Sequence, residues 1–279
     1  MSQDISLFSI PAEKLGAGTK VKVRILPETK DLSYDMAIQI LLEVVENNKK
    51  GKHTTLIMPV GPIGQYEIMV RLINEHKISF KNVHFFQMDE YLTRDMKYIP
   101  EDSPMSFTGI VKKQFLNLLD ADVSLPASQY YVPQPGNEGA IAKRIEELGG
   151  IDSCYGGMGI TGHIAFNEPA SPDDPITDAQ FRELPTRILR LTPETLTINS
   201  STTAGGTIDL VPEWAVTIGM KEILASRKIR LYLNRNWQSG IVRKILHGPI
   251  SRFAPCSFLQ EHPDTVITLT KESATPPRL

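Results

Sequence analysis

The sequence predicts an α/β protein: a mainly parallel sheet covered by helices on both faces, in a single domain. Short apolar stretches that suit strands alternate with longer amphipathic stretches that suit helices. No Gly- or Ser-rich linker divides the 279 residues, which are enough to bury one sizeable core. The 20 prolines and 19 glycines indicate many turns and argue against a coiled coil or a simple helical bundle.

The strand candidates are short stretches rich in apolar and β-branched residues. Residues 21–26 alternate apolar and charged side chains, as a half-buried strand does. Thr54–Met58 is apolar and is ended by Pro59. The later candidates are residues 83–88, 151–155, 187–191, 215–218, 229–233 and 266–269.

Helices are predicted between these strands. The first, residues 31–50, has apolar side chains at spacings of three and four: Tyr34, Ala37, Ile38, Leu41 and Val45. The second can open at Pro62, with a buried stripe of Tyr66, Met69, Val70 and Ile73. The remaining helices are expected over residues 107–119, 141–148 and 237–247.

Composition excludes several classes of function. Thirty basic and 32 acidic residues give a net charge of −2, so there is no general electrostatic reason to bind nucleic acid or a membrane surface. The two cysteines, Cys154 and Cys256, form no CxxC pair, which fits a reducing compartment. Neither a signal peptide nor an apolar run of membrane-spanning length is apparent. We therefore expect a soluble cytoplasmic protein.

Ligands of open α/β sheets bind beyond the carboxyl ends of the strands, and the first polar segment at such an end is Asp89-Glu90-Tyr91. The apolar strand at residues 83–86 leads directly to the two adjacent carboxylates of Asp89 and Glu90. Alone, this segment reads as a solvated acidic turn. The functional interpretation is a carboxylate that acts as a proton-transfer base.

The second segment is a glycine cluster that runs into His163. A Gly-x-Gly-x-x-Gly pattern from Gly157 to Gly162 resembles a dinucleotide fingerprint, but Pro169 follows too soon for the helix that this fingerprint must open. We therefore predict no nucleotide cofactor. Glycines instead let the backbone approach a ligand closely and expose N–H groups.

The polar side chains of this segment that could take part in catalysis are His163, Asn167 and Glu168. Glu168 follows His163 by five residues, near enough in a curled loop to orient the imidazole. A His–carboxylate pair is a usual acid/base unit. A single histidine is more often structural, but its combination with the glycine loop favours catalysis.

The third segment surrounds Gly61, between the strand at Thr54–Met58 and the helix that follows. Such a turn is a natural anion site, because free N–H groups and the helix dipole point there. Pro59 and Pro62 remove donors, so phosphate binding is weakly supported. The other histidines lack ligand spacing, and we predict no metal site.

Three strings of the sequence together resemble the glucosamine-6-phosphate deaminase (isomerase) family, which is related to the 6-phosphogluconolactonases. They are Phe-Gln-Met-Asp-Glu-Tyr at 86–91, Gly-His-Ile-Ala-Phe-Asn-Glu-Pro at 162–169 and Ser-Phe-Leu-Gln-Glu-His-Pro at 257–263. The second string favours the deaminase branch. The resemblance divides the chain into an N-terminal extension, residues 1–20, and a deaminase-like α/β domain, residues 21–279.

The resemblance implies a modified Rossmann-like fold without a nucleotide cofactor, and an enzyme that opens an amino sugar phosphate and moves a proton between C2 and C1. Aldose becomes ketose and ammonia leaves from C2. Asp89 matches the base, His163 the residue that assists ring opening, and Glu168 its orienting carboxylate. The expected substrate contacts are Gly61, Glu90, Thr161, Gly162, Asn167, Arg235 and Gln238. The family resemblance also suggests a homo-oligomer.

The sequence departs from the family pattern at positions where charged residues are expected. Thr161 stands where the family usually has an aspartate, and Gln238 where it has a phosphate-binding lysine. No arginine stands near Ser200-Ser201, where the family binds phosphate. We therefore expect an altered substrate, held by Arg235 or another nearby cation.

The sequence leaves two other functions open. The chain could be a non-catalytic descendant that binds a sugar, which the threonine at position 161 favours. It could also be a sugar lactone hydrolase of the 6-phosphogluconolactonase type. Glu168 and the Asp89-Glu90-Tyr91 string argue against the hydrolase.

Overall fold

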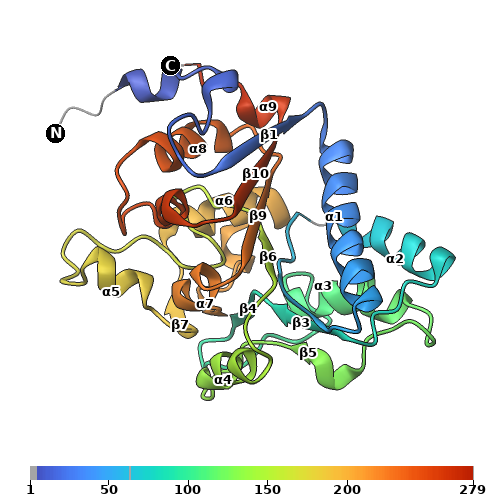
Figure 1. Cartoon of the computed structure of the whole chain (residues 1–279). Coiled ribbons are helices and arrows are strands. Elements are labelled where there is room, and N and C mark those ends of the chain that lie inside the picture. The colour runs from blue at the N-terminus through green and yellow to red at the C-terminus, as the bar shows by residue number, and fades with distance from the viewer. Residues whose placement is uncertain (1–4, 63, 279) are drawn as a thin grey trace.

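The computed structural model describes residues 5–62 and 64–278 and has one large sheet at its centre (Figure 1). Its seven strands run in the order β1-β10-β9-β6-β2-β3-β5, and every neighbouring pair is parallel. The strands are β1 (Lys22–Leu26), β2 (Thr54–Met58), β3 (Val83–Gln87), β5 (Tyr130–Tyr131), β6 (Ser153–Gly156), β9 (Lys228–Leu233) and β10 (Thr265–Thr270). The prediction of a mainly parallel sheet in a single domain is confirmed.

A second, antiparallel sheet has the order β4-β8-β7. Its strands are β4 (Asp89–Leu92), β7 (Arg187–Arg190) and β8 (Trp214–Thr217). The sequence predicted β7 and β8 as strands but did not separate them from the parallel sheet, and it read the start of β4 as a turn. The two sheets meet at Met88, whose N–H donates to Met58 O while its carbonyl accepts from Ile218 N.

Helices cover both faces of the large sheet (Figure 1). They are α1 (Thr29–Lys49), α2 (Gly64–His76), α3 (Phe107–Gln114), α4 (Gly139–Glu147), α5 (Asp178–Arg182), α6 (Pro193–Thr203), α7 (Met220–Leu224), α8 (Gln238–His247) and α9 (Lys271–Ala274). Short 3-10 helices are η1 (Ile5–Ser9), η2 (Ala12–Lys14), η3 (Leu116–Leu118), η4 (Ala127–Gln129), η5 (Ile208–Leu210) and η6 (Pro255–Glu261). Helices α5, α6, α7 and α9 were not predicted.

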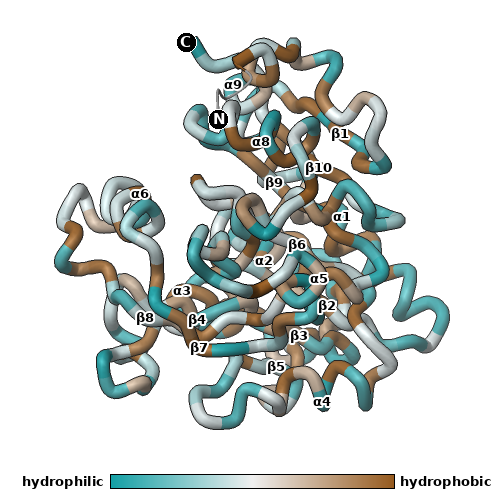
Figure 2. Tube along the Cα trace, turned by 90° about the vertical axis from the view of Figure 1, so that its left-hand side faces the viewer, coloured by the Kyte–Doolittle hydropathy of each residue, from teal (hydrophilic) through white to brown (hydrophobic). Residues whose placement is uncertain are grey.

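Alternate residues of the strands pack into two hydrophobic cores, one on each face of the sheet. Leu56 and Phe85 join the core under α1 and α2, whereas their neighbours Ile57 and Phe86 join the core that includes residues of α8. Figure 2 shows hydrophobic stretches along the central strands and hydrophilic residues in many outer turns, although the outer segment between α6 and β8 also carries hydrophobic residues.

The buried face of α1 matches the predicted stripe only in part: Ala37 and Leu41 are buried as predicted, at 0% and 4% exposed. Tyr34 is 56% exposed, while the i, i+4 series Leu32, Met36, Ile40 and Val44 is fully buried. Apolar residues occur on more than one side of this helix, so spacing alone did not determine which side faces the sheet. Packing against β2 and α2 made that choice.

The N-terminal segment is attached through a buried arginine. Arg243 of α8 is 0% exposed and donates to the carbonyls of Ile10, Ser239 and Ala274 at 2.8, 2.7 and 2.7 Å. Its guanidinium thus connects residues before β1, helix α8 and helix α9. Removal from water lowers the pKa of Arg243.

Candidate active site

Loops from neighbouring strands converge at the carboxyl edge of the large sheet. Gly61 follows β2, Gly157 follows β6, and Tyr232 lies near the end of β9. A Cβ built on Gly157 would lie 3.6 Å from Gly61 O and 3.9 Å from Tyr232 O. The second and third polar segments of the sequence therefore adjoin one another, as the topology of adjacent parallel strands requires.

The glycine loop is a curled segment without a helix, and it carries His163. Gly159 N donates to His163 O and Gly162 N to Gly159 O, both at 3.0 Å. Gly162 has φ +83°, a backbone conformation that favours glycine. The Gly-x-Gly-x-x-Gly pattern thus opens no helix.

His163 and Glu168 form the pair that their spacing predicted. His163 Nδ1 lies 3.1 Å from Glu168 Oε2, and the two residues are only 7% and 8% exposed. Thr161 bridges them: its Oγ1 is 2.8 Å from His163 Nδ1 and donates to Glu168 Oε2 at 3.3 Å. With Nδ1 engaged in this way, Nε2 is the ring nitrogen left to act on a ligand.

The carboxylate of Glu168 is stabilised in its charged form. Burial acts to raise its pKa, but hydrogen bonds from His163, Thr195 and the backbone of Thr192 outweigh burial and lower it. Thr192 and Thr195 are site residues that our sequence reasoning missed. A Thr-Pro-x-Thr signal for a helix start was present at 192–195.

Asp89 is the first residue of β4 and is 7% exposed. Burial, and then the neighbouring charge of Glu90, raise the pKa of Asp89 well above its ordinary value. Across the small sheet Asp89 pairs with Thr217, whose Oγ1 accepts from Phe166 N at 3.0 Å. This link fixes the strand that carries Asp89 against the loop that carries His163.

Aromatic contacts make the same connection. The Tyr91 ring packs on Phe166 with centroids 5.3 Å apart, and Phe166 lies 6.4 Å from the His163 ring. Burial raises the pKa of Tyr91, and the charges of Asp89, Glu90 and Glu168 act in the same direction. The structure therefore places the strand that begins with Asp89 next to the loop that carries His163 and Glu168.

The carboxylate of Glu90, predicted as a substrate contact, faces the start of α3. Its carboxylate accepts from Tyr91 N at 2.8 Å, Phe107 N at 3.0 Å, Thr108 N at 2.6 Å and the Ser106 hydroxyl at 3.3 Å. It is 1% exposed. These four donors hold Glu90 as an anchor for the helix behind Asp89.

Two other predicted contacts also hold the loops together. Asn167 is 0% exposed, donates to Ile164 O and Ile218 O, and accepts from Arg187 Nη1 at 2.7 Å. The Gln238 amide donates to Met158 O at 2.7 Å and accepts from Arg235 N at 2.9 Å. Both ends of the Gln238 amide are thus engaged.

Gly61 and the side chain of Arg235 remain open to a ligand. Both residues are exposed, and a Cβ on Gly61 would meet nothing within 4 Å. Thr161 and Gly162 contribute to the His163 loop as described above. Ser201, at a position where the family resemblance leads us to expect a cation, is exposed and neutral.

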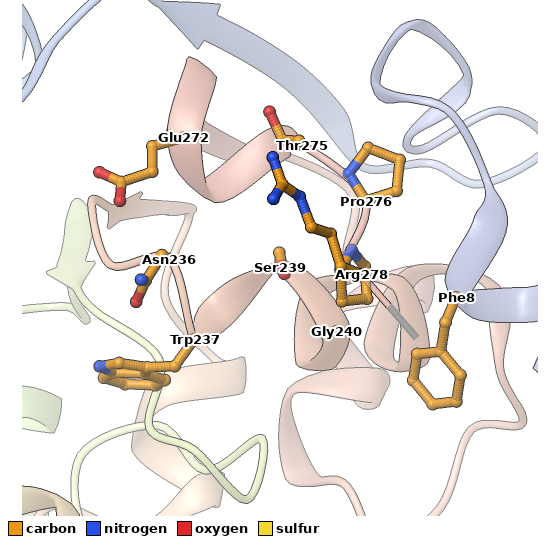
Figure 3. A pocket seen from close by; sticks show the side chains of 10 residues that line it. Phe8, Asn236, Trp237, Ser239, Gly240, Glu272, Thr275, Pro276 and Arg278 are labelled. Atoms are coloured by element: carbon orange, nitrogen blue, oxygen red, sulfur yellow. The ribbon is translucent and has the colours of Figure 1, made fainter.

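A separate cavity of about 750 Å³ lies beyond the ends of β9 and β10 (Figure 3). Trp237 and Asn236, Glu272 of α9, Phe8 and Arg278 line it, and none of the three catalytic candidates does. A smaller cavity of about 270 Å³ adjoins Glu90 and Tyr130.

Across residues 5–62 and 64–278, no cluster of three His, Cys, Asp or Glu side chains could hold a metal ion. No helix within this described part is long and apolar enough to cross a membrane.

Fold and site together define a class: α/β proteins in which the loops that follow parallel strands carry a buried histidine–carboxylate pair at the carboxyl edge of the sheet. A glucosamine-6-phosphate deaminase of Mycoplasma mycoides subsp. mycoides SC is 31% identical over 254 residues, covering 90% of this chain and 96% of that protein. One of Phocaeicola vulgatus is 32% identical over 225 residues, 78% of each protein. The chain belongs to the glucosamine-6-phosphate deaminase family.

Solved structures agree with this assignment. A structure described as a monomeric glucosamine-6-phosphate deaminase has a TM-score of 0.76 at 27% identity, covering 91% of this chain and 99% of that chain. A 6-phosphogluconolactonase from Trypanosoma cruzi has a TM-score of 0.65 at 16% identity, covering 91% and 96%, and shares the fold. No family model matches the chain.

Proposed function

We propose that this protein is an amino sugar isomerase/deaminase that opens the sugar ring, moves a proton from C2 to C1 and releases ammonia. The observation that carries the proposal is the buried His163–Glu168 pair joined through Phe166 and Thr217 to the strand of Asp89. Enolisation needs one positioned carboxylate, and ring opening needs a group that exchanges a proton near neutral pH.

In this mechanism His163 moves the proton during ring opening, from the anomeric hydroxyl to the ring oxygen. Glu168 and Thr161 hold the imidazole by Nδ1, so Nε2 faces the reacting oxygens. Asp89 then takes the proton from C2 and returns it at C1, while one proton of the amine passes to the C1 oxygen; C1 becomes an alcohol and the amine-bearing carbon becomes an imine. Water adds to that carbon, and its C–N bond breaks as ammonia leaves.

We expect the substrate to differ from glucosamine 6-phosphate at the end that carries the phosphate, away from C1 and C2. Gln238 is neutral and engaged on both sides, and Ser201 offers only a hydroxyl. Each missing charge-assisted hydrogen bond removes roughly 1.5–3 kcal/mol of binding. Arg235 is the exposed cation that can hold an anionic or otherwise substituted sugar in this region.

A substrate panel tests the proposal. Ammonia and ketose formation are measured with glucosamine 6-phosphate, glucosamine and amino sugars that carry other anionic groups. We expect turnover that His163→Ala and Asp89→Asn abolish, while His76→Ala and Asp95→Asn, at exposed positions, leave it unchanged. Efficient deamination of glucosamine 6-phosphate would exclude the altered substrate.

Two other outcomes correspond to the alternatives. Acid release from a sugar lactone without ammonia would indicate a lactone hydrolase. Sugar binding with no turnover would indicate a non-catalytic descendant.

The proposal extends to location and assembly. It places the protein in the cytoplasm, as a homo-oligomer whose residues 1–20 are an addition to the family domain at 21–279. A related protein is described as monomeric, so the molar mass in solution tests the assembly directly.

A further inference from the structure

Helix α6 begins against the catalytic pair. Its N-cap residue, Thr192, donates its backbone N–H to Glu168 Oε1 at 3.4 Å, and its hydroxyl accepts from Thr195 N at 3.4 Å. Because α6 is 11 residues long, the partial positive charge of its first turn acts on this carboxylate. The helix thus supplies both a hydrogen bond and a favourable field to Glu168.

Thr195 lies one turn into this helix and is 0% exposed. Its hydroxyl accepts from the Thr192 hydroxyl at 3.3 Å and lies 3.5 Å from His163 Nδ1. Hydrogen bonding from Thr195 also contributes to the lowered pKa of Glu168. One buried hydroxyl therefore serves both members of the pair.

The middle of α6 is held at the opposite side of the site. Asn199 Nδ2 donates to the Tyr91 hydroxyl at 2.9 Å, and Tyr91 belongs to the strand that begins with Asp89. Two titratable groups are coupled to Glu168: His163, which contacts its carboxylate, and Tyr91, whose pKa the charge of Glu168 helps to raise. The helix is thereby fixed relative to both the base and the imidazole.

We infer that Thr195 is a positioning residue which, with the first turn of α6, holds ionised Glu168 against His163 so that the imidazole carries its proton on Nδ1. Thr161, the other residue that contacts both members of the pair, brings a hydroxyl and no charge. Helix α6 supplies the stabilisation of the pair that a neutral residue at 161 does not. The role of Thr195 in turnover rests on the proposed function, whereas its effect on the His163 tautomer does not.

The first test uses nuclear magnetic resonance on the protein without substrate. The ring ¹⁵N signals are assigned to His163 by their loss in His163→Asn, and the Glu168 carboxyl is followed by ¹³C. We expect the Nδ1–H tautomer in the wild type, in Thr195→Ser and in the control Thr197→Val, an exposed threonine of the same helix. Thr195→Val mixes the tautomers and raises the pKa of Glu168.

The second test is kinetic and uses the best substrate of the panel. Thr195→Val is expected to lower kcat about tenfold with little change in KM, and to move the acid limb of the pH profile upwards; Thr195→Ser restores both. Thr195→Ala gives the same readouts if the valine variant does not fold. A Thr195→Val protein with an unchanged tautomer and an unchanged pH profile would overturn the inference. A chain with no turnover still reports the tautomer, so the two proposals fail separately.

Discussion

Gly159 lies directly beneath the imidazole of His163. A Cβ built on Gly159 would overlap the ring atoms Nε2, Cε1 and Cδ2, and the Gly159 N–H donates to His163 O at 3.0 Å. The position of the His163 ring therefore depends on the absence of a side chain at residue 159. The glycine-rich segment serves close approach of a side chain to the backbone.

Gly159→Ala is expected to displace the imidazole and to lower kcat/KM at least about 100-fold, because misplacement of a reacting group by about 1 Å has effects of that size. Steady-state kinetics with the best substrate measures this loss. Gly139→Ala, at a glycine whose added Cβ meets nothing within 4 Å, is the matched control and retains activity. Equal activity in both variants would contradict the proposed ring geometry.

Glu90→Gln is expected to shift the pH dependence of turnover. The charge of Glu90 adds to burial in raising the pKa of Asp89, so its removal lowers that pKa and keeps Asp89 ionised at lower pH. The acid limb of kcat/KM therefore moves to lower pH. Loss of charge-assisted bonds to the start of α3 also lowers stability by about 1–3 kcal/mol.

The control is Glu101→Gln, at a residue whose side chain is 58% exposed in its ion pair with Lys112. It is expected to leave the acid limb in place. A limb that stays fixed in Glu90→Gln, or moves equally in both variants, would show that Glu90 does not set the pKa of Asp89.

Asp89→Asn is expected to remove activity and yet stabilise the fold above neutral pH. Because the folded-state pKa of Asp89 is raised, the folded protein binds more protons than the unfolded chain between the two pKa values, and stability falls as pH rises through that window. Each unit of raised pKa costs about 1.4 kcal/mol at high pH. Asparagine does not titrate, so the variant does not lose this stability as the pH rises.

Denaturation midpoints of the wild type and Asp89→Asn at about pH 5 and pH 8 measure the effect. The stability advantage of the variant is expected to grow from the lower to the higher pH. An advantage that stays constant would mean that Asp89 has an ordinary pKa in the folded protein. Asp95→Asn, at an exposed aspartate beyond β4, serves as the control without such a trend.

Much of the fold could be predicted because local patterns determine it. The strand predicted at Thr54–Met58 has the same bounds in the structure, and the helix predicted at 237–247 differs by one residue. Spacing alone also placed Glu168 near His163. Buried parallel strands and curled glycine loops leave strong local signals.

Features fixed by distant contacts could not be predicted in this way. The chain passes from one sheet to the other at Met88 because Met58 O and Ile218 N, far apart in sequence, bond to it. Helix α6 buries mainly Thr195 and Ser200, so it lacks the apolar stripe on which helix prediction depends. The N–H donors that surround the Glu90 carboxylate also come from a later segment, at Phe107 and Thr108, and no local pattern indicates them.

Arg243 gives the last prediction, which concerns the N-terminal segment. Its guanidinium is fully buried and donates to three carbonyls, of which Ile10 O belongs to the segment before β1. Arg243→Met leaves these carbonyls without this donor, and we expect a loss of about 3 kcal/mol or more in the free energy of unfolding. Residues 5–20 should then exchange amide hydrogens and be cleaved by protease faster than in the wild type.

The control is Arg71→Met, at a side chain that is 81% exposed, which should leave stability within about 0.5 kcal/mol of the wild type. An Arg243→Met protein as stable as the control would show that apolar contacts such as Leu15, not the guanidinium, hold the segment in place.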